Sequence, residues 1–319
     1  MIHQMKFFII IFSLFLTNLS EAQKVKSFRN GNVELFYEVE GRGKPLYILT
    51  GGPGHPPAIP GHGLMDSLKQ NYTVVLLHQR GTGKSRGILC NVENISVNAF
   101  ISDIAMLMKA RGDQKITLLG ISWGGFLAQT FAAFHPQKVS NLVLVCAAPP
   151  SYKLWPVLEA NQFAKYSQTE KDSMRLLQNI FNTKSPADLE ALKLTHPSSK
   201  ELLAFYQFIR ILHRSHFYDR SRIESNFDQI LNDFNFQLIP IIDKEIMEKK
   251  WDITAQLKKL SIPALILYGR QDDQGESTFF LQKECLKNSK MIVIEQCGHM
   301  IWEDQPTEFY KAMKAYLIK

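Results

Sequence analysis

The sequence predicts an α/β protein with a mostly parallel central sheet, because runs typical of strands alternate with runs typical of helices. Strand-like runs of apolar and β-branched residues occur at 33–39, 46–50, 72–78, 116–119, 141–147, 263–269 and 291–296. Helical spacing of apolar residues occurs near 96–111, 122–135, 276–287 and 306–317. Since parallel strands need crossover connections, we expect these helices to cover both faces of the sheet.

One long stretch interrupts this alternation. Between Pro149 and Ser261 no strand-like run is long enough to extend the sheet, whereas Leu, Phe and Ile recur at helical spacing. We therefore predict that residues 149–261 form a helical cap inserted over the C-terminal edge of the sheet. Residues 23–148 and 262–319 then form the α/β core domain.

The bulk composition is that of an ordinary globular protein. The chain has 319 residues, of which 45% are apolar, and this is enough for a full hydrophobic core. The net charge of +7 is spread thinly, so we expect no nucleic-acid partner. Four cysteines are too few for a disulfide scaffold. Cys146 is expected to be a buried thiol in a strand, while the pairing of Cys90, Cys285 and Cys297 stays open.

The N-terminus has the pattern of a secretory signal peptide. Lys6 precedes an apolar run from Phe7 to Thr17, and Ser20 and Ala22 place small residues at the cleavage positions. The run is short for a membrane span. We predict that residues 1–22 are removed and that the protein is secreted or periplasmic, with no stable membrane anchor after cleavage. An uncleaved anchor is the alternative.

Ser122 is the candidate nucleophile. It is the centre of a Gly-x-Ser-x-Gly pattern that follows the apolar run 116–119 and precedes a helical pattern. A strand, a sharp turn and a helix force the central serine into strained backbone angles and expose its hydroxyl at the helix N-terminus. A Cβ at Gly120 or Gly124 would collide with the closely packed backbones. The alternative is a serine with only a structural role in a turn.

A serine nucleophile needs a base and an acid, and in such a fold they follow the serine in the order acid, histidine. His299 comes after the run 291–296 and a glycine, and it is the best candidate base among nine histidines. Asp272 and Asp273 follow the run 263–269. We favour Asp272 as the acid and expect Asp273 to lie in a surface turn.

Two backbone N–H groups are candidates for an oxyanion hole. Gly52 lies in "TGGPGHPP", directly after the run 46–50, and Trp123 follows the serine. Glycine N–H groups in such a loop can point at a developing oxyanion. The alternative for the first stretch is a Gly-Pro turn without a chemical role.

We expect neither a metal nor a cofactor. His213 and His216 are spaced for one face of a helix, but no carboxylate or cysteine pattern completes a metal site, and we expect a pair on the cap surface. No dinucleotide fingerprint is present, and "HQRGTGKS" (78–85) lacks the spacing of a phosphate-binding loop. We expect instead a turn in which Arg80 braces the loops of the site.

Five segments together resemble the α/β-hydrolase superfamily, and within it the proline iminopeptidase-like branch. They are "GGPG" (51–54), "HQRGTGKS" (78–85), "GISWGG" (120–125), "GRQDD" (269–273) and "GHMIWEDQP" (298–306). The resemblance covers most of the chain outside the cap. It implies an α/β-hydrolase fold with Ser122 as nucleophile, Asp272 as acid and His299 as base. It also implies an oxyanion hole formed by Gly52 and Trp123.

This chain departs from the branch at three places. Thr50 stands where the branch usually has His before Gly-Gly-Pro-Gly, and His78 stands where it usually has Asp before Gln-Arg-Gly. Peptidase members place a cap glutamate on the substrate amine, in a stretch resembling Glu-Asn-His-Tyr-Phe. The nearest match here begins with Arg214, so a cation would replace the anion.

The resemblance implies a serine hydrolase that forms an acyl-enzyme, with an aminopeptidase of proline iminopeptidase type as the leading function. The substrate would be a small molecule or short peptide. An esterase or other acyl hydrolase is the first alternative, and a catalytically silent binding module is the second. An aminopeptidase needs an acid in the cap for the substrate ammonium, because burying an unpaired charge costs several kcal/mol. The candidates are Glu201, Asp219, Glu224 and Asp228.

Overall fold

The computed structural model describes residues 25–222 and 227–318, and it confirms the predicted α/β fold. The strands are β1 (Val25–Asn30), β2 (Val33–Gly41), β3 (Lys44–Leu49), β4 (Tyr72–His78), β5 (Ile116–Ile121), β6 (Val139–Val145), β7 (Ala264–Gly269) and β8 (Ser289–Ile294). β1 is an additional strand, and the other strands correspond to the predicted runs. The predicted signal peptide, residues 1–22, lies outside the described residues.

All eight strands form one sheet, in the order β1-β2-β4-β3-β5-β6-β7-β8. β1 pairs antiparallel with β2 and β2 antiparallel with β4, while the remaining pairs are parallel. Every residue of the central strands β5 and β7 is buried, which agrees with their apolar composition. Because β3 to β8 all run in the same direction, the loops after these strands meet at one edge of the sheet.

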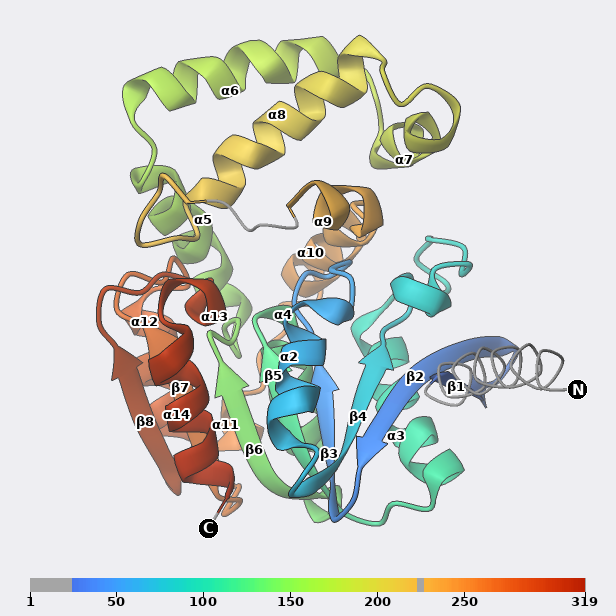
Figure 1. Ribbon diagram of the computed structural model, residues 1–319, viewed down its shortest axis with the longest axis vertical. Helices are drawn as coiled ribbons and strands as arrows, with labels where there is room; N and C mark the ends of the chain where they lie inside the picture. The colour runs from blue at the N-terminus through green and yellow to red at the C-terminus, as the bar shows by residue number, and fades with distance from the viewer. Residues whose placement is uncertain (1–24, 223–226, 319) are drawn as a thin grey trace, which may run out of the picture.

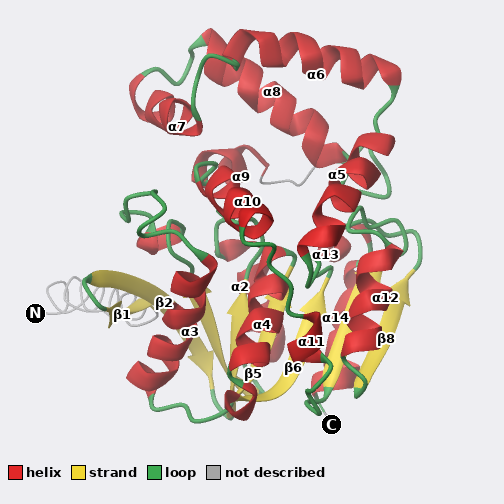
Figure 2. Cartoon of the chain, turned by 180° about the vertical axis from the view of Figure 1, so that it is seen from behind, coloured by secondary structure: helices red, strands yellow, loops and turns green. Residues whose placement is uncertain are grey.

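The helices of the core cover both faces of the sheet. They are α2 (Ala58–Leu68), α3 (Val97–Arg111), α4 (Trp123–Phe134), α12 (Glu276–Cys285), α13 (Ile301–Asp304) and α14 (Pro306–Leu317). Figure 1 shows α2 and α14 in front of the sheet, and the reverse view in Figure 2 shows α3, α4 and α12 in front of the other face. The predicted helices at 96–111, 122–135, 276–287 and 306–317 are thus present.

The segment 149–261, which we call the cap segment, joins β6 to β7. Its described helices are α5 (Trp155–Ala164), α6 (Gln168–Phe181), α7 (Pro186–Thr195), α8 (Lys200–Arg214), α9 (Phe227–Asp233), α10 (Leu238–Glu248) and α11 (Thr254–Leu257). Figure 1 shows α5 to α10 beyond the arrowheads of the parallel strands. The cap segment has a small apolar core of its own, which includes Leu202, Phe205 and Phe236. It therefore lies over the edge where the strand-end loops meet.

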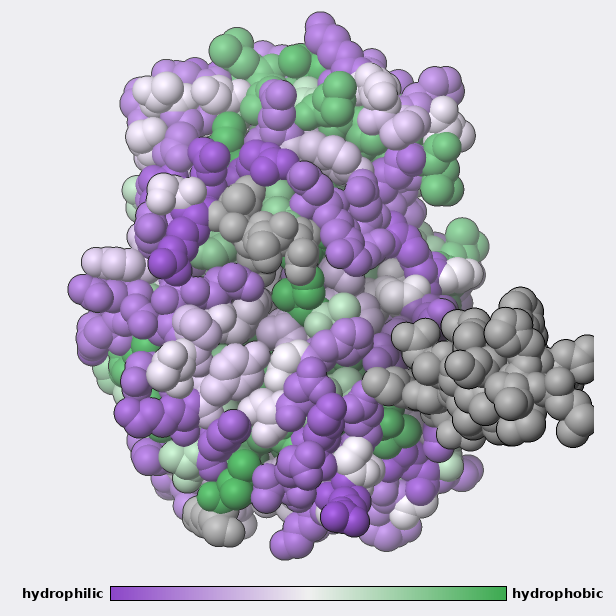
Figure 3. Space-filling model, in the orientation of Figure 1, coloured by the Kyte–Doolittle hydropathy of each residue, from purple (hydrophilic) through white to green (hydrophobic). Residues whose placement is uncertain are grey.

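The outer surface of the cap segment is amphipathic. Figure 3 shows hydrophobic residues among hydrophilic ones at the top of the molecule, where α6 and α8 lie. Leu176 on α6 and Leu203 on α8 expose 68% and 47% of their surface, while other apolar residues of α8 face the cap core. Among the described residues, no helix is both long enough and apolar enough to cross a membrane.

Candidate active site

Ser122 lies at the sharp turn between β5 and α4. Its backbone has φ 52° and ψ −118°, and such a positive φ is rare for a residue other than glycine. The neighbouring backbones are packed too closely for side chains. A Cβ on Gly120 would collide with the Gly124 carbonyl, and a Cβ on Gly124 would collide with the Leu49 carbonyl. The turn therefore has the strained geometry that the Gly-x-Ser-x-Gly pattern predicts.

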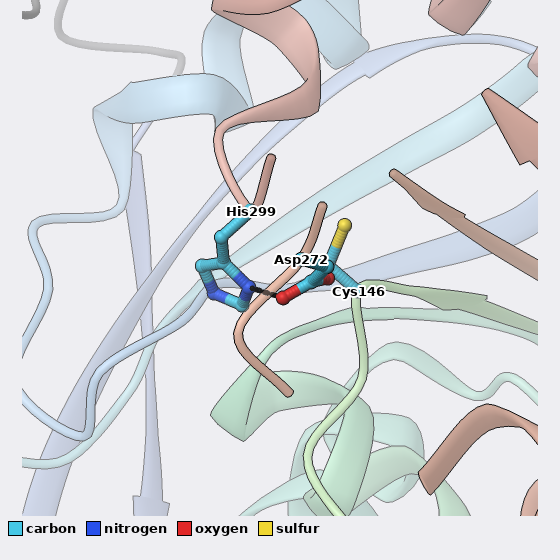
Figure 4. Close-up of side chains that lie close together, drawn as sticks. All are labelled: Cys146, Asp272 and His299. Atoms are coloured by element: carbon cyan, nitrogen blue, oxygen red, sulfur yellow. Dashed lines mark hydrogen bonds and ion pairs between the residues drawn. The ribbon is translucent and has the colours of Figure 1, made fainter. Parts of the chain in front are cut away.

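Asp272 and His299 meet from two separate loops. Asp272 follows β7, His299 follows β8, and both side chains are buried. Asp272 Oδ1 lies 2.8 Å from His299 Nδ1 in a hydrogen bond (Figure 4). With Nδ1 held in this way, Nε2 is the ring nitrogen that remains for a second partner. Burial opposes protonation of the imidazole, but the Asp272 carboxylate outweighs it, and the pKa of His299 is raised.

Asp273 makes a different contact. Its Oδ1 atom lies 3.7 Å from His299 Nδ1, while its Oδ2 atom lies 2.7 Å from Nδ1 of His216. The hydrogen-bond acceptor for His299 Nδ1 is thus Asp272, the acid favoured above. The prediction that Asp273 lies in a surface turn is wrong, since this residue is only 1% exposed. A loop that carries two buried acids has no distinctive local sequence pattern.

The cap histidines also correct a prediction. His213 is buried and His216 is half-buried, and both line the cavity next to His299. The His216 and His299 rings lie 5.2 Å apart between centroids. The expectation of a pair on the cap surface is therefore wrong. Helical spacing placed the two residues near each other, but it gave no information about which way the end of α8 faces.

The glycine loop after β3 lies beside the serine. A Cβ built on Gly51 would lie 3.3 Å from Ser122 Cβ and 3.8 Å from Ser122 Oγ, and Gly52 lines the same cavity. Trp123 is the first residue of α4, where the N–H has no acceptor within the helix. Trp123 is thus next to the serine in the chain, and Gly52 reaches the same cavity from the loop after β3.

Gln79 joins these two segments, and sequence analysis did not identify it. Its Nε2 donates to the Thr50 carbonyl at 2.8 Å, and its Oε1 accepts from the Trp123 indole Nε1 at 3.2 Å. The side chain is 2% exposed. The signal was present in the sequence, because Gln79 lies in "HQRGTGKS" directly after a buried strand. Thr50 thus takes part in the site through its carbonyl group, which any residue would supply.

Arg80 was expected to brace the loops of the site, and its contacts tie the loop after β4 to α3. Its guanidinium makes a bidentate contact with Asp103 on α3, at 2.6 Å for both nitrogen–oxygen pairs, and donates to the Asn94 carbonyl at 2.8 Å. His78 fills the position where Asp is usual in the branch. It bridges Glu38 on β2, 2.9 Å from its Nε2, and the Lys84 backbone N–H, 3.0 Å from its Nδ1. This histidine therefore links β2 to the loop after β4.

A cavity of about 370 Å³ lies between the strand-end loops and the cap segment. Ser122 and His299 line its floor, and aromatic side chains of the cap, among them Trp155, Phe227 and Phe236, line its walls. Among the described lining residues the only carboxylates are Glu159 and Asp243, and none is lysine or arginine. The cavity is therefore apolar with a local negative charge.

The predicted partners for a substrate amine that lie within the described residues do not line this cavity. Asp228 pairs with Arg210 on the surface, at 2.6 Å, and Asp219 contacts Ser221. Glu201 lies in the first turn of α8, away from the lining residues, and Glu224 lies outside the described residues. The prediction is thus wrong for Glu201, Asp219 and Asp228.

Arg214 is exposed and also absent from the lining, so no arginine replaces the expected anion. Asp243 on α10 lies in an amphipathic helical pattern without a motif, and sequence alone gave no reason to choose it. Burial raises the pKa of its carboxyl group, although the Trp155 indole N–H donates to it at 3.2 Å.

Cys146 lies beside the acid and the base (Figure 4). One donor atom each of Cys146, Asp272 and His299 lies within 4.8 Å of the others, which is close enough to consider a metal. However, burial and the Asp272 carboxylate raise the pKa of the Cys146 thiol, which disfavours the thiolate that binds metals. Asp272 and His299 are moreover bonded to each other. All four cysteines are free, and Cys146 is buried as predicted.

Comparisons with known proteins agree with this geometry. A family model described as "alpha/beta hydrolase fold" matches residues 44–306. A proline iminopeptidase from Saccharolobus solfataricus is 26% identical over 288 residues, which cover 88% of this chain and 87% of that protein. The crystal structure of a proline iminopeptidase from Mycobacterium smegmatis has a TM-score of 0.66 at 19% identity, with 92% of this chain and 97% of that chain covered.

An esterase from Exiguobacterium antarcticum has the same TM-score, 0.66, at 20% identity, with 92% of this chain and 99% of the esterase covered. At these identities the two solved structures establish a shared fold only. The family model, in contrast, spans most of the chain. The chain therefore belongs to the α/β-hydrolase fold family, and within it is a hydrolase similar to the proline iminopeptidases.

Proposed function

We propose that this protein is a serine hydrolase that forms an acyl-enzyme and acts as an aminopeptidase on substrates with a free N-terminal amine, such as prolyl peptides. The observation that carries the proposal is one cavity lined by Ser122, by His299 with its hydrogen bond to Asp272, and by the half-buried carboxylate of Asp243. The first two supply the chemistry of acyl transfer. The carboxylate supplies the selectivity for a cation.

In the proposed reaction His299 is the general base. Because Asp272 holds Nδ1, His299 Nε2 takes the proton from Ser122 Oγ as the oxygen attacks the substrate carbonyl carbon. His299 then gives this proton to the nitrogen of the leaving amine, and the acyl-enzyme forms. A water molecule, deprotonated in the same way, attacks the acyl carbon and releases the acid and Ser122.

The tetrahedral intermediate carries a negative charge on its oxygen. We assign its stabilisation to the backbone N–H groups of Gly52 and Trp123, which flank the serine. The Trp123 N–H is at the first position of α4, where the helix dipole favours an anion. Gln79 holds the two donor segments together through the Thr50 carbonyl and the Trp123 indole.

Asp243 is the proposed partner of the substrate amine. It lines the cavity from the cap segment, and Glu159 is the second carboxylate at this cavity. No arginine or lysine among the described lining residues competes for either acid. Burial raises the pKa of Asp243, and a bound ammonium group would provide the counter-charge that favours its ionised form. The apolar wall fits a proline ring.

The experiment is a set of three substrates with the purified protein: a prolyl arylamide with a free amine, its N-acetylated form, and a short-chain acyl ester. An aminopeptidase cleaves the first and loses activity on the second. Indifference to acetylation together with rapid ester cleavage would contradict the aminopeptidase assignment. That result would establish an esterase, which the largely apolar wall of the cavity also accommodates.

The variant Asp243→Asn tests the amine site. A charge-assisted hydrogen bond contributes about 1.5–3 kcal/mol, so kcat/KM for the free amine should fall roughly tenfold to a hundredfold. Cleavage of the acyl ester should stay the same. The matched control is Glu248→Gln on the same helix, because Glu248 is exposed and pairs with Lys244 at 3.8 Å on the surface. An equal loss for amine and ester substrates would contradict the role of Asp243.

We also propose that residues 1–22 direct export and are then removed. The support is the pattern of a basic residue, an apolar run and small residues before Gln23. Mass spectrometry of exported protein should find Gln23 as the first residue. An intact Met1 in a cytosolic pool would contradict export.

A further inference from the structure

Two buried carboxylates face the same imidazole ring. Asp272 and Asp273 are adjacent in the chain, are 7% and 1% exposed, and lie 2.8 Å and 3.7 Å from His299 Nδ1. Two like charges this close disfavour each other's ionised form, and both oxygens can compete for the single proton on Nδ1. A defined tautomer and orientation of His299 therefore require that one of the two carboxylates has another hydrogen-bond partner.

His216 of the cap segment forms a hydrogen bond with Asp273. The distance from His216 Nδ1 to Asp273 Oδ2 is 2.7 Å, which is shorter than the 3.7 Å from Asp273 Oδ1 to His299. Burial alone would raise the pKa of Asp273, but His216, followed by His299 and Lys165, outweighs it and holds this pKa well below the usual range. Two histidine–aspartate pairs thus lie side by side, one within the core and one between cap and core.

The backbone of His216 holds the same loop. Its carbonyl oxygen accepts hydrogen bonds from the backbone N–H of His299, at 2.6 Å, and of Met300, at 3.2 Å. A Cβ on Gly298 would collide with this carbonyl oxygen, so the close approach requires glycine at that position. The main chain that carries the base is therefore anchored to the cap segment directly.

Two neighbouring contacts reinforce this attachment. Asp304 Oδ2 accepts hydrogen bonds from the backbone N–H groups of Tyr218 and Gly298, both at 2.8 Å. Lys165 on the other side of the segment donates to the Ser215 carbonyl at 2.9 Å and to the Gln271 carbonyl at 2.6 Å. The stretch 215–218 is thus bonded to the loop of the acid and to the loop of the base.

We propose that His216 is a positioning residue for the catalytic base: it engages Asp273, leaves Asp272 as the one hydrogen-bond partner of His299 Nδ1, and makes the base competent only when the cap segment is docked. The inference rests on the proposed role of His299 as the base. His216 acts on the rate of acylation through Asp273 and the His299 loop, and the substrate need not touch it.

The test uses two nearly isosteric variants. H216N keeps an N–H donor close to the position of Nδ1, whereas H216L has the same size and no donor. Small displacements of a catalytic group cost up to a hundredfold in rate, so H216L should lower kcat by about tenfold to a hundredfold with KM nearly unchanged. H216N should restore most of the rate. The matched control is H196L, which removes an exposed cap histidine away from the cavity lining.

A second readout is the rate of covalent labelling by a fluorophosphonate, which measures activation of Ser122 without a requirement for any natural substrate. This rate should fall in H216L and recover in H216N. If H216L does not fold, D273N breaks the charged pair from the core side, and the same loss of kcat with unchanged KM is expected. In the double variant H216L/D273N the two losses should not add, because they interrupt one interaction.

The outcomes separate this inference from the proposed function. If the wild-type protein is not labelled, the serine-hydrolase proposal fails. If the wild type is labelled and H216L is labelled at the same rate, the positioning role of His216 is wrong. A raised KM with unchanged kcat in H216L would mean that His216 binds substrate, and this too would overturn the inference. Equal losses in H216N and H216L would show that the donor at Nδ1 has no role.

Discussion

The strand-end loops of the core and the cap segment differ in how their residues reach the cavity. Ser122, Asp272 and His299 each follow a strand of one sheet, so their positions are determined by the sheet and by the few residues around each turn. His216 lies in the turn after the cap helix α8, and Asp243 lies on the cap helix α10, so their positions depend on how these helices pack against distant elements. Under the proposals above, the core supplies the chemistry, while the cap selects the substrate and positions the base.

The largest effect is expected from Ser122→Ala. The change removes one oxygen atom, and the fold does not depend on this hydroxyl group for its packing. Loss of the nucleophile in such enzymes costs on the order of 10⁴–10⁶ in kcat. The measurements are kcat and the midpoint of thermal unfolding, which should stay close to the wild-type value. A variant with substantial turnover would mean that the core loops do not supply the nucleophile.

The second effect separates the two acids. Asp272→Asn should lower kcat by about 10⁴, because asparagine favours the wrong tautomer of His299, as in the serine-protease case from which this magnitude is taken. Asp273→Asn should cost only about tenfold to a hundredfold, the size expected for a small displacement of the base. Steady-state kinetics on one substrate compares them directly. The reverse ranking would move the acid to Asp273 and make the cap contact part of the triad itself.

The third prediction concerns pH. The base must be neutral, so kcat/KM should fall as pH decreases through the pKa of His299. Burial opposes protonation, but Asp272 and Asp273 raise this pKa, so the midpoint of the acid limb should lie above the usual histidine value of about 6.5. Removal of one raising charge in Asp273→Asn should move the midpoint to lower pH. A midpoint at or below the usual value would contradict the effect of the two carboxylates on His299.

The smallest effect is expected from Arg214→Glu. The resemblance noted in the sequence implied that this residue stands in place of an amine-binding glutamate, yet its side chain is exposed and does not line the cavity. Surface substitutions of this kind change stability by less than about 0.5 kcal/mol. The ratio of free-amine to acetylated cleavage should equal that of the wild type. An increased preference for the free amine would place residue 214 at the substrate and weaken the case for Asp243.

The sequence by itself determined the fold class, the strands of the sheet from β2 to β8, and the residues Ser122, Asp272 and His299 as candidates. These predictions depend on short-range patterns: buried strands are continuous apolar runs, and each candidate follows such a run within a few residues. Arg80 could be chosen on the same grounds, since it lies within the turn that follows β4. Local order is sufficient here because a parallel sheet brings all its strand ends to one edge.

Only the tertiary structure decided the contribution of the cap. Helical spacing predicts that a segment is helical, but it does not determine which turn of which helix faces a cavity formed by other elements. Of the acids chosen from the sequence, Glu201, Asp219 and Asp228 therefore do not line the cavity, while Asp243 does, and the histidine pair expected on the surface lies beside the base. The contact between His216 and Asp273 joins residues far apart in the chain, and it exists only after the cap segment has packed on the sheet.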